Sequence, residues 1–260
     1  MDLEESINVL GLGGGQCLYS CFKVSLEIEV LAVTTELSLV LDCDTPMIFK
    51  LVPSQGPDQV IKALTFDLEG GLEETHFSDG HGNQCVRALM LKGASSLRVS
   101  FEGQQISNGS TRVGHFVPIQ ALPVAVLPFL QPSRYCEADQ FLNITREVIT
   151  DCSPGYDQIE RICSFVQTKF RYEPGSSRTP RSALDAMQDD AGVCRDFAHV
   201  SIAMLRSISI PARYVVGYLG GLLPQDVHAW GEAYVGNRWV AFDATPGLAP
   251  GERIAIAIGR

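Results

Sequence analysis

One cysteine, one histidine and one aspartate stand in an order that suits covalent catalysis by a thiol. Cys194 opens an apolar run that predicts a buried helix ending before Pro211. A thiol at a helix N-terminus lies beside unsatisfied N–H groups and the positive end of the helix dipole, which favour the thiolate and could hold a developing oxyanion. Cys194 is therefore a candidate nucleophile, and an ordinary buried cysteine is the alternative.

The candidate base and its orienting carboxylate come from a hairpin whose register follows from its turn. The segments HAWGEAYV and RWVAFDAT flank Gly236-Asn237, a two-residue connection that favours a type II′ turn. If the residues flanking this turn pair with each other, His228 and Asp243 are diagonal neighbours on one face, about 7–8 Å apart at the backbone. Asp243 would then orient the imidazole, and the other ring nitrogen would take the proton of Cys194.

Three further side chains near this set are weaker candidates. Trp230 shares a face with His228 and either walls a substrate pocket or packs against Trp239. His199 follows the cysteine by five positions, so we expect it to point away from the thiol and to act indirectly or structurally. Arg195, in the first helical turn, could shape substrate entry, although solvation of the helix end is the reading we prefer.

Several blocks of sequence carry a resemblance to a known family. They are PSRYC, FRYEPGSSRTPRSALDAM, GVCRDFAH, IPARYVVGYL, DVHAWGEAYV and WVAFDATPG. In this order, from about Pro132 to Gly259, they resemble the bacterial transglutaminase-like proteins, a group of candidate cysteine proteases in the transglutaminase core superfamily. The resemblance implies a papain-like α+β domain whose nucleophile helix packs on an antiparallel sheet. It also implies that Cys194, His228 and Asp243 are nucleophile, general base and third member of a triad.

The resemblance implies an enzyme that acts on amide bonds of a peptide or protein through a thioester acyl-enzyme, which water or an amine resolves. Three functions stay open: hydrolysis as in a protease or amidase, protein cross-linking, and a non-catalytic binding or scaffold role. Tyr172 is a candidate pocket residue by the same resemblance. Family members usually have proline where Ala244 stands, and they continue through a strand beyond Arg260. Another copy of the chain could supply that edge, which leaves a homo-oligomer open.

The periodicity of the chain divides it into four parts. Residues 1–18 are expected to be a flexible leader, and residues 19–117 a sandwich-like β domain of short alternating strands. Residues 118–132, rich in proline, are the expected linker. Residues 133–260 then form the catalytic domain, with one helix capped by Ser153 and another over residues 179–187.

Composition narrows the partners and the location. The net charge of −10 disfavours nucleic acid and anionic membranes, and no apolar stretch reaches transmembrane length. The acidic N-terminus is unlike a signal peptide, so a cytoplasmic location and free thiols are expected for the eight cysteines. Without a Cys-x-x-Cys pair or phosphate loop we expect no metal and no cofactor, and the group His76, Asp79 and His81 is interpreted as a polar turn.

Overall fold

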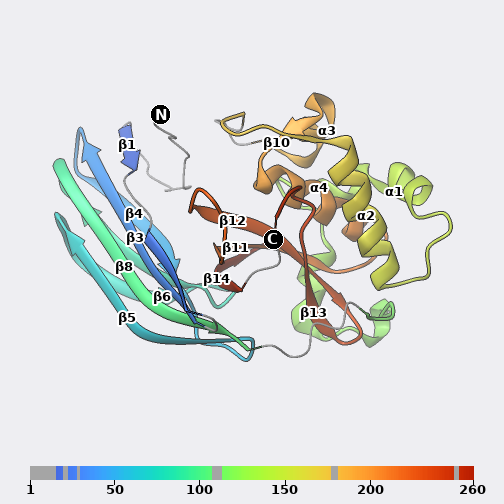
Figure 1. Cartoon of the computed structure of the whole chain (residues 1–260), viewed down its shortest axis with the longest axis horizontal. Coiled ribbons are helices and arrows are strands. Elements are labelled where there is room, and N and C mark those ends of the chain that lie inside the picture. Colours follow the sequence, from blue (N-terminus) through green and yellow to red (C-terminus); the bar gives the residue numbers. More distant parts are fainter. Residues whose placement is uncertain (1–15, 20–22, 28–29, 107–112, 177–180, 249–251) are drawn as a thin grey trace. The chain divides into compact units, whose positions relative to one another are not determined.

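The computed structural model describes residues 16–19, 23–27, 30–106, 113–176, 181–248 and 252–260 (Figure 1). The chain forms two compact units, each assembled from several stretches of sequence. Unit 1 contains residues 1–108, 216–227 and 249–258, and unit 2 contains residues 109–215, 228–248 and 259–260. The four parts expected from the sequence are contiguous, whereas these units interleave along the chain.

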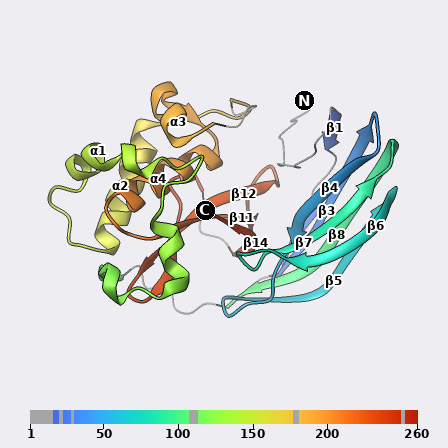
Figure 2. The ribbon, with the colours of Figure 1, turned by 180° about the vertical axis from the view of Figure 1, so that it is seen from behind.

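Unit 1 holds two antiparallel sheets, as Figure 2 shows from behind. The first sheet has the order β1-β3-β8-β5, with β2 also paired to β3, and the second has the order β4-β7-β6. The strands are β1 (Gln16–Tyr19), β2 (Lys23–Glu27), β3 (Val30–Leu41), β4 (Thr45–Val52), β5 (Gln59–Glu69), β6 (Gly71–Ser78), β7 (Gln84–Met90) and β8 (Gly93–Gln105). The all-β N-terminal region expected from the alternating pattern is confirmed. Of the expected leader, residues 1–15 lie outside the described residues and residues 16–18 belong to β1.

The core of unit 1 draws on both ends of the chain. Alternate residues of β3 and β8 are buried, as period-two patterning requires of strands with one covered face. Tyr218, Ile254 and Ile256 join the same core from the C-terminal half. Polar contacts fix these segments: the Tyr218 hydroxyl bonds to Thr35, and the amide of Gln59 exchanges hydrogen bonds with the Ala255 backbone at 2.9 Å each way. This packing is the reason why unit 1 is not a contiguous stretch.

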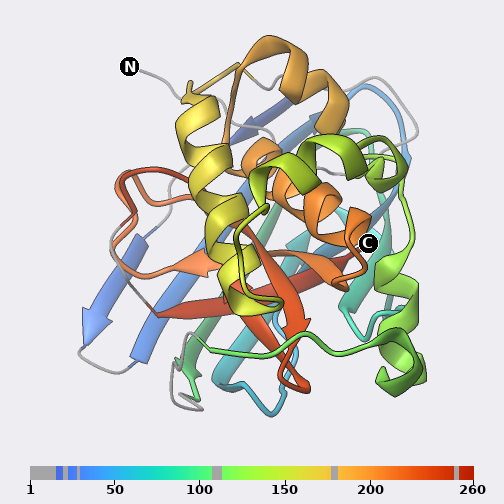
Figure 3. The same ribbon diagram turned by 90° about the vertical axis from the view of Figure 1, so that its right-hand side faces the viewer.

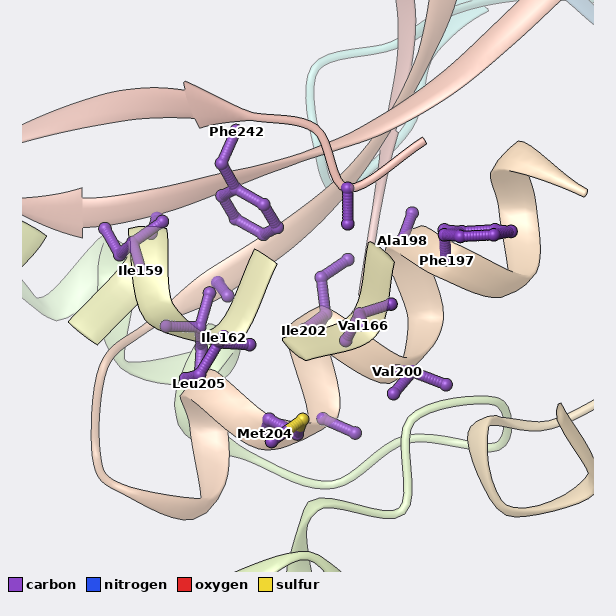
Figure 4. Packing of buried hydrophobic residues seen from close by; sticks show 14 of the residues in the cluster. Ile159, Ile162, Val166, Phe197, Ala198, Val200, Ile202, Met204, Leu205 and Phe242 are labelled. Atoms are coloured by element: carbon purple, nitrogen blue, oxygen red, sulfur yellow. The ribbon is translucent and has the colours of Figure 1, made fainter. Parts of the chain in front are cut away.

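Unit 2 is built around one buried helix, α4 (Cys194–Ser207), every residue of which from Asp196 to Arg206 is buried. Helix α2 (Tyr156–Lys169) lies beside α4, as Figure 3 shows. Figure 4 shows Ile159, Ile162 and Val166 of α2 packed with α4 and with Phe242. The remaining helices are α1 (Leu142–Val148), α3 (Ala183–Asp189) and the 3-10 helices η1 (Ile119–Ala121), η2 (Val124–Leu130) and η3 (Ala138–Gln140).

A four-stranded sheet completes the C-terminal half, with the order β13-β12-β11-β14. Its strands are β11 (Ala212–Leu219), β12 (Val227–Val235), β13 (Arg238–Phe242) and β14 (Arg253–Gly259). Two short strands, β9 (Arg171–Tyr172) and β10 (Ala191–Gly192), pair in parallel just before α4. The predicted α+β class, with a nucleophile helix packed on a sheet, is confirmed. None of the helices in the described ranges has the length and apolar character needed to cross a membrane.

Some local predictions differ from the structure. Residues 118–132, the expected linker, contain η1 and η2, and Leu122 and Val126 are buried with Tyr234. Helix α2 begins at Tyr156 after Gly155, whose φ of 116° and close approach to the Gly114 carbonyl exclude a side chain, and not after Ser153.

Two further corrections concern a helix and a turn. Helix α3 spans Ala183–Asp189, capped by the Ser182 side chain, where the sequence predicted residues 179–187. The hairpin turn has positive φ at both Gly236 and Asn237, 57° and 61°, which fits type I′ and not type II′. Asparagine tolerates the left-handed region, so a Gly-Asn pair can adopt either turn.

Candidate functional site

Cys194 is the first residue of α4, and the residues around it fix the start of that helix. The Asp196 carboxylate is fully buried and accepts a hydrogen bond from the Val193 N–H at 3.0 Å. A Cβ on Gly192 would lie 2.6 Å from the Asp196 Cβ, so the chain needs glycine there. The Gly192 carbonyl in turn accepts from the Glu173 N–H at 3.0 Å. The thiol is therefore held at a capped helix N-terminus, as the sequence predicted.

His228 and Asp243 are in direct contact. The hairpin ladder runs from Val235 opposite Arg238 to Gly231 opposite Phe242, which is the predicted register. Beyond the end of this ladder, His228 Nε2 lies 2.7 Å from Asp243 Oδ2. The predicted reach of the two side chains is confirmed.

The environment of the pair suits an orienting role for the carboxylate. The other oxygen of Asp243 accepts from the Thr245 N–H at 3.0 Å, so both carboxylate oxygens are engaged. The side chains of His228 and Asp243 are only 3% and 10% exposed. Because Nε2 is turned to the aspartate, Nδ1 is the ring nitrogen left for exchanging a proton with another group.

Trp230 lies against the imidazole and away from the second tryptophan. Its ring is 2% exposed and stacks on His228 with 6.3 Å between centroids and 20° between planes. Trp239 instead contacts Tyr234 and Phe129, at 5.4 and 5.3 Å between centroids. The ring contacts described for the two tryptophans do not join them to each other, and the place of Trp230 in a substrate pocket stays a prediction.

His199 is buried between two tyrosines. Its ring stacks parallel to Tyr135, with centroids 5.5 Å apart and planes 4° apart, and it meets Tyr214 at 5.0 Å and 44°. Burial, with a smaller contribution from the charge of Arg195, lowers the pKa of His199 to about 3, so the ring is neutral at ordinary pH. A neutral stacked ring suits the indirect or structural role expected for this histidine.

The two remaining candidates flank the first turn of α4. The Arg195 side chain is 19% exposed and its Nε lies 3.7 Å from Asp196 Oδ1, so it is more enclosed than a solvated helix end would be. Tyr172 on β9 is 43% exposed, and its ring centroid lies 6.2 Å from that of Phe197. Neither the enclosure of Arg195 nor the ring contact of Tyr172 assigns a role in substrate binding, so a pocket role for these two residues stays a prediction.

Other thiols in unit 2 have properties unlike those of a nucleophile. Burial raises the pKa of Cys136 to about 11. Burial, and then the nearby charge of Asp243, raises the pKa of Cys163 still further. The six cysteines whose side chains the structure describes form no disulfide. Over the same described ranges, no group of three or more His, Cys, Asp or Glu side chains is arranged to hold a metal ion.

Tyr214 and Tyr135 are the site neighbours that the sequence interpretation missed. Both lie within motifs that carried the resemblance, IPARYVVGYL and PSRYC, but neither residue type stands at a catalytic spacing. Burial raises the pKa of the Tyr214 hydroxyl well above its usual range, and the charge of Cys194 raises it further. The ring of Tyr214 contacts His199, on the helix that begins with Cys194.

Comparison with known proteins identifies the family of the domain that contains this site. Residues 142–244 match the profile of the transglutaminase-like superfamily. A crystal structure from Cytophaga hutchinsonii, described as a candidate cysteine protease, matches with a TM-score of 0.80 at 29% identity, over 92% of this chain and 84% of that chain. The resemblance carried by the sequence motifs is confirmed.

Two curated relatives match in shorter regions. An uncharacterized protein of Mycobacterium leprae is 31% identical over 140 residues, 50% of each chain. The protein-glutamine gamma-glutamyltransferase of Pseudomonas aeruginosa is 28% identical over 127 residues, which are 42% of this chain and 19% of that enzyme. The chain thus spans half or less of the length of these relatives.

Proposed function

Because residues 142–244 form a domain of the transglutaminase-like superfamily, we propose that the protein is a cysteine-nucleophile enzyme that acts on amide bonds. In this proposal Cys194 attacks the amide carbonyl, His228 is the general base and Asp243 orients the imidazole. The observation that carries the proposal is the buried 2.7 Å contact between His228 and Asp243, in the unit whose central helix begins with Cys194.

The reaction proceeds in two steps. His228 Nδ1 accepts the thiol proton, and the Cys194 sulfur forms a bond to the carbonyl carbon, whose π electrons move to oxygen. When the carbonyl re-forms, the C–N bond breaks and the amine leaves with the proton from the imidazolium, so that a thioester remains. Water or an amine then attacks the thioester, again with His228 taking a proton, and the thiol is regenerated. The Asp243 carboxylate stabilises the transient imidazolium throughout.

The proposed substrate is an amide of a peptide or protein, and hydrolysis is the first candidate for the second step. The match of 0.80 in TM-score to the candidate cysteine protease, over 92% of this chain, supports hydrolysis. The likeness to the Pseudomonas glutamyltransferase supports amine transfer, over 42% of the chain. We also propose a cytoplasmic location, which the absence of disulfides among the six described cysteine side chains supports.

Trapping the acyl-enzyme tests the proposal. Incubation with p-nitrophenyl acetate should give a burst of nitrophenol and acetylate Cys194, as peptide mass spectrometry would show. Cys194→Ser should abolish the burst, whereas Cys152→Ser, which removes another accessible free thiol, should keep it. Adding a primary amine would separate the two acceptors, because a transferase yields the amide and a hydrolase yields acetate. A wild-type protein that never acetylates Cys194 would favour the scaffold role.

A further inference from the structure

The hairpin that carries His228 and Asp243 ends its ladder with a glycine opposite a phenylalanine. The pairs between β12 and β13 run from Val235 opposite Arg238 to Gly231 opposite Phe242. Asp243 directly follows Phe242 in the chain, and His228 stands three residues before Gly231. This last pair is therefore the position of the ladder from which both proposed catalytic side chains depart.

The Phe242 ring occupies the space that a side chain at position 231 would need. A Cβ built on Gly231 would lie 2.5 Å from Cε2 and 2.8 Å from Cε1 of this ring, closer than real Cβ contacts come. The φ of Gly231 is outside the left-handed region, so its backbone conformation does not call for glycine. Glycine is needed here because an aromatic ring from the partner strand lies against its backbone.

The same ring anchors the strand that leads into Asp243. Strand β13 lies at the edge of its sheet, where β12 is its neighbour, and Phe242 is the one buried residue among the five of this strand. Figure 4 shows the ring pointing toward α2 and α4, in the cluster that contains Ile159, Ile162 and Ile202. A shift of the ring would therefore move the end of β13, and with it the backbone of Asp243.

We propose that Gly231 and Phe242 are positioning residues for the proposed triad. The bare glycine lets the ring lie against β12, and the packed ring fixes the backbone from which Asp243 reaches His228. The assignment rests on the proposed function, because it concerns the orientation of the proposed base. The contact of 2.7 Å between Nε2 and Oδ2 leaves little room for movement, and a misplacement of about 1 Å in such a site can cost about 100-fold in rate.

The first test is Gly231→Ala, with two readouts. One is the rate constant for acetylation of Cys194 by p-nitrophenyl acetate. The other is the downfield proton NMR signal of the His228 Nε2–H, which is assigned by its loss in His228→Ala and reports the contact with Asp243 whether or not the protein is an enzyme. We expect Gly231→Ala to lower the rate constant about 10–100-fold and to shift or remove the signal.

Gly103→Ala is the matched control for strain. Its Cβ would lie 2.8 Å from Cγ1 and 2.9 Å from Cδ1 of Ile254, a comparable overlap within the core of unit 1. This variant should lower the free energy of unfolding in urea but keep the wild-type rate constant and NMR signal. Equal losses of rate in Gly103→Ala and Gly231→Ala would overturn the positioning role, because lost stability would then explain both.

A second substitution tests whether the contact itself carries the effect. Phe242→Leu keeps an apolar side chain in the core but has no ring to meet a new Cβ. Alone it should slow acetylation, because the strand loses part of its anchor. Added to Gly231→Ala, it should raise the rate constant and restore the NMR signal, an effect of opposite sign. If Gly231→Ala yields no soluble protein, the double variant should yield it. Losses that add in the double variant would overturn the proposal.

The remaining outcomes separate this proposal from the proposed function. A wild-type rate constant and an unchanged signal in Gly231→Ala would overturn the positioning role alone. A wild-type protein in which Cys194 is never acetylated would overturn the proposed function. If the His228 signal still responded as expected to Gly231→Ala and to the double variant, the placing of His228 and Asp243 by the two residues would be supported even then.

Discussion

His228 Nε2 and Asp243 Oδ2 lie 2.7 Å apart, and the second carboxylate oxygen is held by the Thr245 N–H at 3.0 Å. The aspartate therefore has one orientation, and it fixes which nitrogen of the imidazole carries the proton. The general base of a triad depends on this tautomer, because the ring nitrogen that faces the nucleophile must be unprotonated to accept its proton.

Replacing Asp243 with asparagine should lower the rate constant for acetylation of Cys194 by about 10³–10⁴, because an amide can hold the wrong tautomer of the imidazole. The fold should persist, since asparagine has the same shape. Burst kinetics with p-nitrophenyl acetate measure the change. Asp139→Asn, at an exposed position in η3, is the matched control and should behave as wild type. A loss of less than tenfold in the acetylation rate constant of Asp243→Asn would contradict the orienting role of Asp243.

Gly192→Ala should have two effects: it should lower the free energy of unfolding and slow the reactions of Cys194. The added Cβ would lie 2.6 Å from the Asp196 Cβ and 2.7 Å from its Oδ2, so the carboxylate that caps α4 must move. Overpacking of this kind costs about 1–3 kcal/mol of unfolding free energy. Urea denaturation and iodoacetamide labelling report the two effects. Gly80→Ala, whose Cβ would meet nothing within 4 Å, is the control. Equal stability of both variants would contradict the described contact.

His199 should make the free energy of unfolding depend on pH. Its pKa is about 3 in the folded protein and about 6.5 in an unfolded chain. As pH falls below 6.5, the unfolded chain takes up a proton here and the folded protein does not. The contribution of His199 to the free energy of unfolding is thus fully present above pH 6.5. It decreases by about 1.4 kcal/mol per pH unit as the pH falls toward 3.

Denaturation of wild type and His199→Phe at pH 6 and pH 4 measures this contribution. Other titrating groups cancel in the comparison, so wild type should lose about 2–3 kcal/mol more than the variant over this interval. An equal loss in both proteins would show that His199 is protonated in the folded state.

Deleting residues before Pro118 should yield an insoluble or protease-sensitive product, although every candidate site residue is retained. Tyr218, Ile254 and Ile256 belong to the core of unit 1, and the deletion would expose them. Soluble yield and limited proteolysis compare the product with the full chain. A soluble product that unfolds cooperatively and acetylates its nucleophile would show that the C-terminal half folds alone.

The sequence predicted those features that depend on local rules. The start of α4 at Cys194 and the pairing of Val235 with Arg238 follow from the apolar run and from the two-residue turn, and both are confirmed. The contact between His228 and Asp243 followed from that register. The turn type was predicted wrongly, because residue types alone do not fix the φ of Asn237.

Features that depend on long-range packing could not be predicted from the sequence. Period-two patterning marks Tyr218 and Ile254 as buried strand residues but does not say which core buries them. The prolines before Pro132 favour a linker in the sequence. The burial of Leu122 and Val126 in this stretch arises from their packing with Tyr234, which is distant in the sequence. Tyr214 gave no signal, because its place beside His199 arises only when β11 packs on α4.

The most direct test of the central claim is the pH dependence of Cys194 alkylation by iodoacetamide, followed at that residue by mass spectrometry in wild type and in His228→Ala. The buried thiols of Cys136 and Cys163, with raised pKa values, should label slowly and serve as internal references. Rapid labelling of Cys194 well below the free-thiol pKa of about 8.5, lost in His228→Ala, is the predicted result. Slow labelling that the mutation does not change would contradict an activated thiolate and imidazole pair.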